Sequence, residues 1–245
     1  MHRDIVCILR IVFDSLPKFI RNSKLFFRII IIFFKLPSSL FNFRTDYKKG
    51  KIKNLSNLYS SKSKESLKRV SPTTDINSLH LNLIKDYFKN FKPNNYADIG
   101  CGTGFLINHL IPLNIANKFF GIDYEKPLLR ENHKIEIIKG DIKKTLLKSD
   151  ENSHDFVTCT HVIEHLEEAK IVIKNLRRIT SKVLIIICPL EKPYKWGLNY
   201  HINFFSNKKT FLNFIHKEFY EKKIPLPSYD VHIRLGDIMY VEYIQ

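Results

Sequence analysis

The sequence predicts an open α/β fold, because short apolar runs alternate with helical patterns from Asn94 onward. Residues 183–188 are continuously apolar, as expected for a parallel strand that is buried on both faces. Residues 231–244 instead contain stretches of period-2 alternation, which is typical of a closing antiparallel hairpin. Together these patterns predict a mostly parallel sheet with helices between its strands.

Each remaining element has a local signal of its own. Four earlier runs are rich in β-branched or aromatic residues, and turn residues or a helical stretch follow each of them. These predicted strands are residues 96–99, 118–122, 135–139 and 155–159. Helices are expected at residues 105–110, 166–178 and 208–219.

Three zones divide the 245 residues. Residues 1–37 are predicted to form a basic amphipathic helix, residues 38–91 a linker that ends in an amphipathic run, and residues 92–245 the α/β domain. The chain has 40 Lys and Arg against 24 Asp and Glu, a net charge of +16. Residues 1–90 hold 18 of these basic residues and 6 of the acidic ones, so the basic character lies mainly in the N-terminal third.

Composition excludes several classes of protein. A hydrophobic content of 44% with 26% charged residues excludes a wholly disordered or fibrous chain. No basic run contains a nucleic-acid-reading motif, so we expect no nucleic-acid partner. The four cysteines form no CxxC pair, which favours a reducing compartment. Charges interrupt the apolar N-terminus, so we predict neither a spanning helix nor a signal peptide, and we expect a cytoplasmic location.

The most specific motif is a glycine-rich turn. Gly100, Gly102 and Gly104 follow a predicted strand and open a predicted helix. Glycine permits a tight turn and lets a ligand lie against bare backbone. The G-x-G-x-G spacing differs from the G-x-G-x-x-G of dinucleotide-binding proteins. The preceding Asp98 carboxylate suits a cationic ligand better than two phosphates.

Two further acids end the next two strands. Asp123 lies where α/β nucleotide-binding sheets accept hydrogen bonds from ribose hydroxyls. Asp141 lies where a carboxylate could accept from an adenine amino group. The carboxyl ends of neighbouring parallel strands converge on the ligand-binding crevice, so this ordered set predicts a nucleoside-type ligand.

With this set, residues 75–245 resemble the class I S-adenosylmethionine-dependent methyltransferases. The resemblance implies a Rossmann-like, seven-stranded, mostly parallel sheet with an antiparallel last strand, and S-adenosyl-L-methionine as the cofactor. It also implies that residues 38–91 fold over the cofactor as a lid, to which Tyr59, Arg69 and His80 could contribute. The family's cofactor-binding positions match Asp98, Gly100, Cys101, Gly102, Gly104, Asp123, Tyr124, Asp141, Ile142 and Thr160.

Two histidines are the candidates for catalysis. The sulfonium is already an activated methyl donor, so the enzyme mainly aligns a nucleophile and removes its proton. His201 lies in an aromatic loop after the fifth strand, and the ordinary pKa of histidine suits a general base near neutrality. The alternative is a histidine that only hydrogen-bonds this loop. His161, at the end of the fourth strand, is the second candidate.

The histidines also raise the possibility of a metal site. His161, Glu164 and His165 share one face if residues 161–165 are helical. With His201 they resemble the metal-binding set of the small-RNA 2′-O-methyltransferases and ubiquinone-biosynthesis O-methyltransferases. One carboxylate and three imidazoles would favour zinc or another transition metal. Metal-free relatives carry a similar stretch and spacing alone does not establish a site, so we predict no metal.

Residues 1–37 combine a basic stripe with a broad apolar side. Lys18, Arg21, Lys24, Arg28 and Lys35 fall within about 120° of one another on a helical projection, although Pro17 should break the helix. This pattern is typical of a helix that lies in a membrane interface. The alternative is a helix docked on its own catalytic domain or on a partner.

Residues 191–205 resemble the acceptor loops of bacterial saccharide- and quinone-type methyltransferases. With the N-terminal pattern, this resemblance implies an S-adenosylmethionine-dependent O-methyltransferase that acts on a small-molecule, glycan or lipid-linked acceptor at the membrane surface. A polyprenyl-quinone precursor is the nearest rival to a glycan acceptor. The alternatives are an RNA methyltransferase and a catalytically inactive, membrane-associated cofactor-binding protein. An Asn/Asp-Pro-Pro-Tyr loop is absent after the fourth strand, which argues against methylation of a base amino group.

Overall fold

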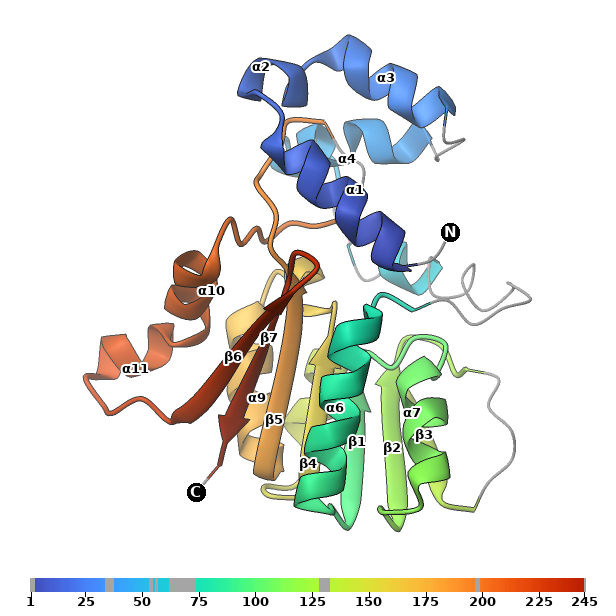
Figure 1. Cartoon of the computed structure of the whole chain (residues 1–245), viewed down its shortest axis with the longest axis vertical. Helices are drawn as coiled ribbons and strands as arrows, with labels where there is room; N and C mark the ends of the chain where they lie inside the picture. Colours follow the sequence, from blue (N-terminus) through green and yellow to red (C-terminus); the bar gives the residue numbers. More distant parts are fainter. Residues whose placement is uncertain are drawn as a thin grey trace.

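A computed structural model describes residues 3–33, 38–52, 55, 57–61, 74–127, 133–196 and 199–244. Its centre is a seven-stranded sheet with the strand order β3-β2-β1-β4-β5-β7-β6 (Figure 1). The strands are β1 (Asn95–Ile99), β2 (Lys118–Asp123), β3 (Ile135–Lys139), β4 (His154–Thr160), β5 (Thr180–Pro189), β6 (Ser228–Arg234) and β7 (Asp237–Tyr243). All five predicted single strands and the predicted closing hairpin are present.

The directions of the strands confirm the predicted fold class. Strands β1 to β5 pair with one another in parallel. Strand β7 runs antiparallel to both β5 and β6. The strand order reverses next to β1, so the crevice between β1 and β4 is the switch point at which such sheets bind ligands.

Helices cover both faces of the sheet and bury two separate clusters of apolar side chains. Helices α6 (Ser78–Phe91) and α7 (Phe105–Leu110), with the short η1 (Ile111–Leu113), cover one face. Helices α8 (Ile142–Lys148), α9 (Ala169–Ile179) and α10 (Lys208–Ile215) cover the other face (Figure 1). On the first face Phe88 is fully buried among the rings of Tyr96, Phe119 and Phe156.

Two predicted helices have different bounds in the structure. The helix expected at residues 208–219 is divided at His216 into α10 and α11 (Lys217–Lys222). His216 is fully buried, and its Nε2 lies 2.9 Å from the Tyr240 hydroxyl, so the helix is interrupted where His216 contacts β7. The helix expected from residue 166 begins at Ala169, because η2 (Ile163–His165) is a 3₁₀ turn.

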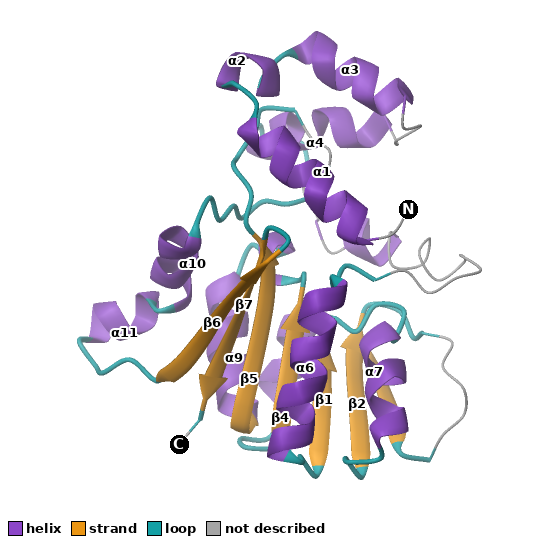
Figure 2. Cartoon of the chain, viewed as in Figure 1, coloured by secondary structure: helices purple, strands orange, loops and turns teal. Residues whose placement is uncertain are grey.

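The N-terminal segment forms several short helices rather than one. These are α1 (Arg3–Ser15), α2 (Lys18–Arg21), α3 (Lys24–Phe33) and α4 (Ser38–Lys48). Pro17 cannot donate a helical hydrogen bond, and it separates α1 from α2. The four helices lie beyond the carboxyl ends of the parallel strands (Figure 2). None of the described helices combines the length and the apolar character needed to cross a membrane.

Polar contacts fix this segment to the α/β domain. Asp4 accepts hydrogen bonds from the backbone N–H and the hydroxyl of Ser78 at 2.9 and 2.7 Å. Arg10 forms a 2.5 Å ion pair with Asp237, whose side chain is fully buried at the start of β7. Asp14 accepts a 3.0 Å hydrogen bond from the backbone N–H of Lys192. The inner side of α1 is therefore docked on the domain.

Candidate functional site

A cavity of about 320 Å³ lies at the carboxyl ends of β1, β2 and β4. It is large enough for a nucleoside-sized ligand. Its lining comes from the turns after these strands and from segments that precede and follow them. The lining residues are Tyr59, Thr74, Asp75, Ile76, Asp98, Gly100, Cys101, Gly102, Thr103, Phe105, Leu106, Asp123, Tyr124, Ile142, Thr160, His161, Val162, His165, Leu166 and Tyr200.

The turn between β1 and α7 requires its glycines. Gly100, Gly102 and Gly104 have φ angles of 78°, 53° and 74°, in the left-handed region that favours glycine. A Cβ on Gly100 would lie 2.2 Å from Val162 Cγ2. A Cβ on Gly102 would meet no atom within 4 Å, because this glycine faces open space. The turn thus presents bare backbone to the cavity, and Gly104 stands at the N-terminus of α7.

Asp98 is the buried carboxylate of this site. It is 2% exposed, and its Oδ1 accepts a 2.8 Å hydrogen bond from the Thr158 hydroxyl. Burial raises the pKa of Asp98 to about 7, although the Thr158 hydrogen bond opposes this shift. A buried carboxylate at the cavity wall gains stability when a cation binds beside it. The ammonium group of S-adenosylmethionine is a cation of this kind.

The other two predicted acids have different positions. Asp123 lines the cavity and accepts hydrogen bonds from the backbone N–H groups of Gly102 at 2.8 Å and Tyr124 at 2.7 Å. It therefore joins the end of β2 to the glycine turn. Asp141 caps α8 through the Lys144 N–H and accepts a 3.1 Å hydrogen bond from the Tyr124 hydroxyl. It is not among the lining residues, so its link to the cavity runs through Tyr124.

Most of the predicted cofactor-binding residues meet at this cavity. Eight of the ten line it, and Gly104 and Asp141 support those that do. Sequence reasoning missed the contribution of residues 74–76, which approach the cavity just before α6. Of the three lid candidates, Tyr59 lines the cavity. His80 is fully buried on α6 against Asn77, and Arg69 lies outside the described residues.

His201 forms a dyad with Glu191 that the sequence did not indicate. Its Nδ1 lies 2.5 Å from Glu191 Oε1, so Nδ1 carries the proton and Nε2 is left as an acceptor. Glu191 is buried, and burial would raise its pKa, but His201, Arg44 and Arg10 together outweigh this effect and lower the pKa of Glu191. A carboxylate that holds an imidazole in this way orients it to take up a proton.

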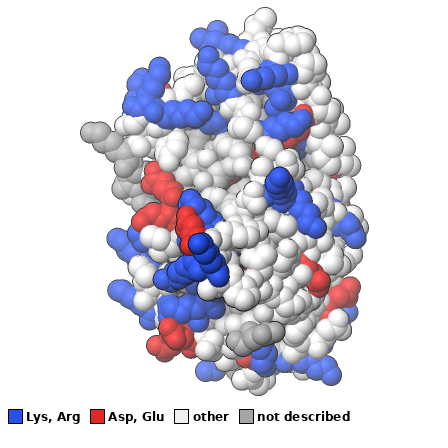
Figure 3. All heavy atoms as spheres, turned by 90° about the vertical axis from the view of Figure 1, so that its left-hand side faces the viewer, with Lys and Arg blue, Asp and Glu red and all other residues white. Residues whose placement is uncertain are grey.

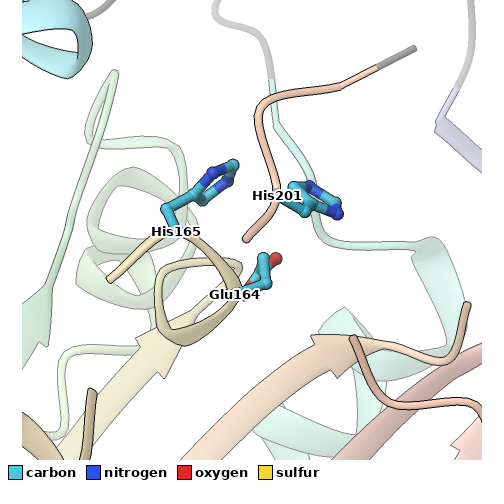
Figure 4. A group of neighbouring side chains, drawn as sticks. All are labelled: Glu164, His165 and His201. Carbon is cyan, nitrogen blue, oxygen red and sulfur yellow. The ribbon is translucent and has the colours of Figure 1, made fainter. Parts of the chain in front are cut away.

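Glu164, His165 and His201 surround a common space (Figure 4). Their nearest ligand atoms lie within 4.8 Å of one another. His165 Nδ1 lies 3.3 Å from the Tyr200 carbonyl oxygen, which can only accept, so His165 Nε2 is also an acceptor. Burial lowers the pKa of His165 to about 3 and raises that of Glu164 to about 7. These three residues could hold a transition metal.

His161 does not share one helical face with Glu164 and His165. Its φ angle is 55°, so the chain turns at His161 before the 3₁₀ helix η2 begins. Its Nδ1 lies 3.3 Å from Glu164 Oε1, but neither oxygen of Glu164 has a hydrogen-bond partner among the described residues. His161 therefore lies outside the group of three possible ligands, although it lines the cavity. Burial lowers its pKa well below the usual value.

Comparisons with known proteins agree with this geometry. Residues 97–187 match the model of a family described as a methyltransferase domain. The chain is 25% identical over 142 residues to the O-antigen chain terminator bifunctional methyltransferase/kinase WbdD of Escherichia coli. That match covers 49% of this chain but only 19% of WbdD.

Two solved structures share the fold. One is the N-methyltransferase NodS of Bradyrhizobium japonicum in complex with S-adenosyl-L-homocysteine, with a TM-score of 0.52 and 14% identity over 77% of this chain and 98% of that one. The other is the magnesium protoporphyrin IX methyltransferase of Synechocystis, with a TM-score of 0.51 and 14% identity over 78% and 98% of the two chains.

The sheet, the glycine turn and the family match define the class of this protein. The chain contains a class I S-adenosylmethionine-dependent methyltransferase domain. It is an enzyme, and S-adenosylmethionine is its cofactor. The cavity fits this cofactor. The buried Asp98 carboxylate suits its ammonium group, the bare backbone at Gly102 leaves room for the ligand, and the Asp123 carboxylate could accept hydrogen bonds from its ribose.

Asp98 makes the affinity for S-adenosylmethionine depend on pH. Because the pKa of this carboxyl is about 7, its ionised form is present above that pH and is lost as the pH falls. We expect the Kd to rise by up to about tenfold for each pH unit below 7. Isothermal titration calorimetry across this range measures the effect.

Two variants act as controls for the pH dependence. Asp98→Asn should bind S-adenosylmethionine weakly and with little dependence on pH, whereas Asp86→Asn, an exposed change on α6, should behave like the wild type. The same steep profile in Asp98→Asn would show that another group carries the titration.

Proposed function

We propose that this enzyme O-methylates a small-molecule or glycan-type acceptor and that His201 removes the proton from the acceptor hydroxyl. One observation carries the proposal: the His201–Glu191 dyad lies directly beside the cofactor cavity. The rings of His201 and His165 are 4.6 Å apart, and His165 lines the cavity.

Each residue around the cavity has a separate role in the proposed reaction. Bound S-adenosylmethionine supplies an activated methyl group. Asp98, Gly102 and Asp123 would fix the position of the cofactor. The protein then mainly has to align the acceptor with the methyl group. His201 Nε2 would accept the hydroxyl proton, and Glu191 would stabilise the resulting imidazolium. Neutral His161 would line the end of the cavity at which transfer takes place.

Aromatic side chains favour a flat or ring-shaped acceptor. Tyr59 and Tyr200 line the cavity, and the Tyr59 hydroxyl donates a 2.7 Å hydrogen bond to the carbonyl oxygen of Tyr200. Such rings provide apolar contact area together with polar groups at their edges. The similarity to an O-antigen chain terminator supports a glycan as the first acceptor to test. The basic, apolar N-terminal helices support a location at the cytoplasmic face of a membrane, where the acceptor would be lipid-linked.

Replacing the base tests the mechanism. We expect His201→Gln to lower kcat by about 10²- to 10⁴-fold, because the imidazole that takes up the proton is lost. Glu191→Gln should lower kcat less, since the imidazole remains. Both variants should keep the wild-type Kd for S-adenosylmethionine. His133→Gln, an exposed change, is the matched control. Wild-type kcat in His201→Gln would contradict the assignment.

Dialysis against a chelator distinguishes a role of His201 as general base from a role as metal ligand. Burial raises the pKa of Glu164 to about 7, so its carboxyl can be protonated and uncharged near neutral pH without any metal beside it. Dialysis against EDTA should therefore leave kcat unchanged. A loss of activity that zinc restores would instead assign Glu164, His165 and His201 as metal ligands.

A panel of acceptors tests the substrate class. The enzyme is incubated with radiolabelled S-adenosylmethionine and with soluble glycans, polyprenyl-quinone precursors or RNA, and the methylated product is counted. We expect label in the glycan fraction, because the acceptor end of the site is aromatic and carries a general base. Transfer only to the quinone would reject the glycan, and transfer only to RNA would reject a small-molecule acceptor.

A further inference from the structure

The N-terminal helices α1–α4, here called the cap, hold the loop that carries His201. Asn22 accepts hydrogen bonds from the backbone N–H of Lys195 at 3.1 Å and from Trp196 Nε1 at 3.0 Å. The Trp196 ring stacks on Phe41 of α4, with ring centroids 4.9 Å apart. The inner side of the cap is thus part of the support of the active site.

Arg44 extends this support to the dyad. Its guanidinium is buried, donates to Asn199 Oδ1 at 2.6 Å, and lies 3.8 Å from the centre of the Tyr194 ring. Asn199 in turn donates to Glu191 Oε2 at 3.1 Å. One chain of contacts therefore runs from α4 to the carboxylate that orients His201.

The opposite side of the cap carries exposed apolar side chains. Along α1, exposed apolar side chains recur at helical spacing, and α3 carries a second row of the same kind, with Phe19 of α2 between the two helices. Their exposed fractions range from 44% to 77%. Contiguous exposed apolar area of this kind marks a binding surface. The residues are Ile5, Ile8, Leu9, Val12, Phe19, Leu25, Ile29 and Ile32.

The exposed charge beside these rows is positive. Both acids of α1 are engaged, Asp4 by Ser78 and Asp14 by Lys192. Lys18, Lys24 and Arg28 are exposed, and none of them forms an ion pair with a residue that the structure describes. Lys24 and Arg28 also lie over the rings of Trp196 and Phe41, 5.7 and 5.8 Å from the ring centroids. In Figure 3, Lys and Arg side chains gather at the end of the molecule formed by the cap, next to uncharged surface.

We propose that the outer side of α1, α2 and α3 is a docking surface for the interface of an anionic lipid bilayer. Short helices with an apolar row and flanking basic residues lie in the plane of such an interface. The apolar rows would enter the boundary of the acyl chains, and Lys18, Lys24 and Arg28 would contact lipid phosphates. None of the described helices is suited to crossing the bilayer, so the contact is peripheral.

Docking would place the acceptor end of the site next to the bilayer, because the cap lies between the lipid surface and the loop of His201. An acceptor anchored in the same leaflet would then reach the dyad from the side of the cap. This consequence rests on the proposed function, whereas the docking itself does not.

Vesicle sedimentation with the full chain tests the docking. The wild type should sediment with vesicles of phosphatidylglycerol and phosphatidylcholine, and at least about tenfold less with phosphatidylcholine alone, because each basic residue near an anionic surface contributes about fivefold. Ile29→Glu combined with Ile32→Glu should abolish sedimentation. Ile224→Glu combined with Leu226→Glu adds the same charge at exposed positions between α11 and β6 and should leave sedimentation unchanged.

Several results would overturn the proposal. One is a wild type that does not bind anionic vesicles; another is equal loss of binding in both double variants. Light scattering that shows a wild-type dimer, lost in the Ile29/Ile32 variant, would assign the surface to a second copy of the chain.

Calorimetry with S-adenosylmethionine keeps this test separate from that of the proposed function. The Ile29/Ile32 variant should bind the cofactor as tightly as the wild type, which also shows that it is folded. Vesicle binding without transfer to any acceptor would reject the function and leave the docking intact.

Discussion

A carboxylate held almost out of water at the end of a central strand organises this molecule. Asp98 follows two buried residues of β1, and its ionised form is costly there unless a cation or hydrogen-bond donors lie beside it. Thr158 supplies one donor from the neighbouring strand β4. After β1 the chain must turn sharply, so that the other side of the Asp98 carboxylate stays open to a ligand. The left-handed φ angles of three glycines make this turn possible, and the missing side chain of Gly102 leaves open space for a ligand.

The acceptor end of the site depends on a second long-range arrangement. Asp237, at the start of β7, is fully buried and accepts hydrogen bonds from Arg10 of α1 and from Asn77. His161 Nε2 lies 3.8 Å from the same carboxylate. The N-terminal helix and the wall of the cavity therefore share one buried charge, so loss of α1 would leave Asp237 without its cation next to His161. The cap therefore contributes to the electrostatic environment of His161.

The sequence predicts what local patterns can encode. The strands and the glycine turn were found because apolar runs and a compact motif specify them within a few residues. Asp98, Asp123 and Ile142 reach one cavity because the carboxyl ends of neighbouring parallel strands converge. Tyr59 was predicted only as part of a lid, and the contributions of residues 74–76 and Glu191 were not predicted. They depend on how distant segments fold back over the sheet, and no local pattern specifies such contacts.

In two places, tertiary packing decides what the local sequence pattern could not. The spacing of His161, Glu164 and His165 was interpreted as one helical face, but the chain has a positive φ at His161 and only a 3₁₀ turn after it. The N-terminal amphipathic pattern predicted either membrane contact or docking on the domain. The structure shows docking on the inner side and leaves apolar rows exposed on the outer side, where membrane contact stays a prediction.

The most direct test of the central claim is a calorimetric titration of S-adenosylmethionine into the wild type and Asp123→Ala. Asp123 connects the end of β2 to the glycine turn and lines the cavity where the ribose would lie. We expect micromolar binding by the wild type and an affinity at least about tenfold weaker in the variant, because hydrogen bonds to a charged group are lost. A folded wild type that does not bind the cofactor would contradict the account, as would a variant that binds it equally well.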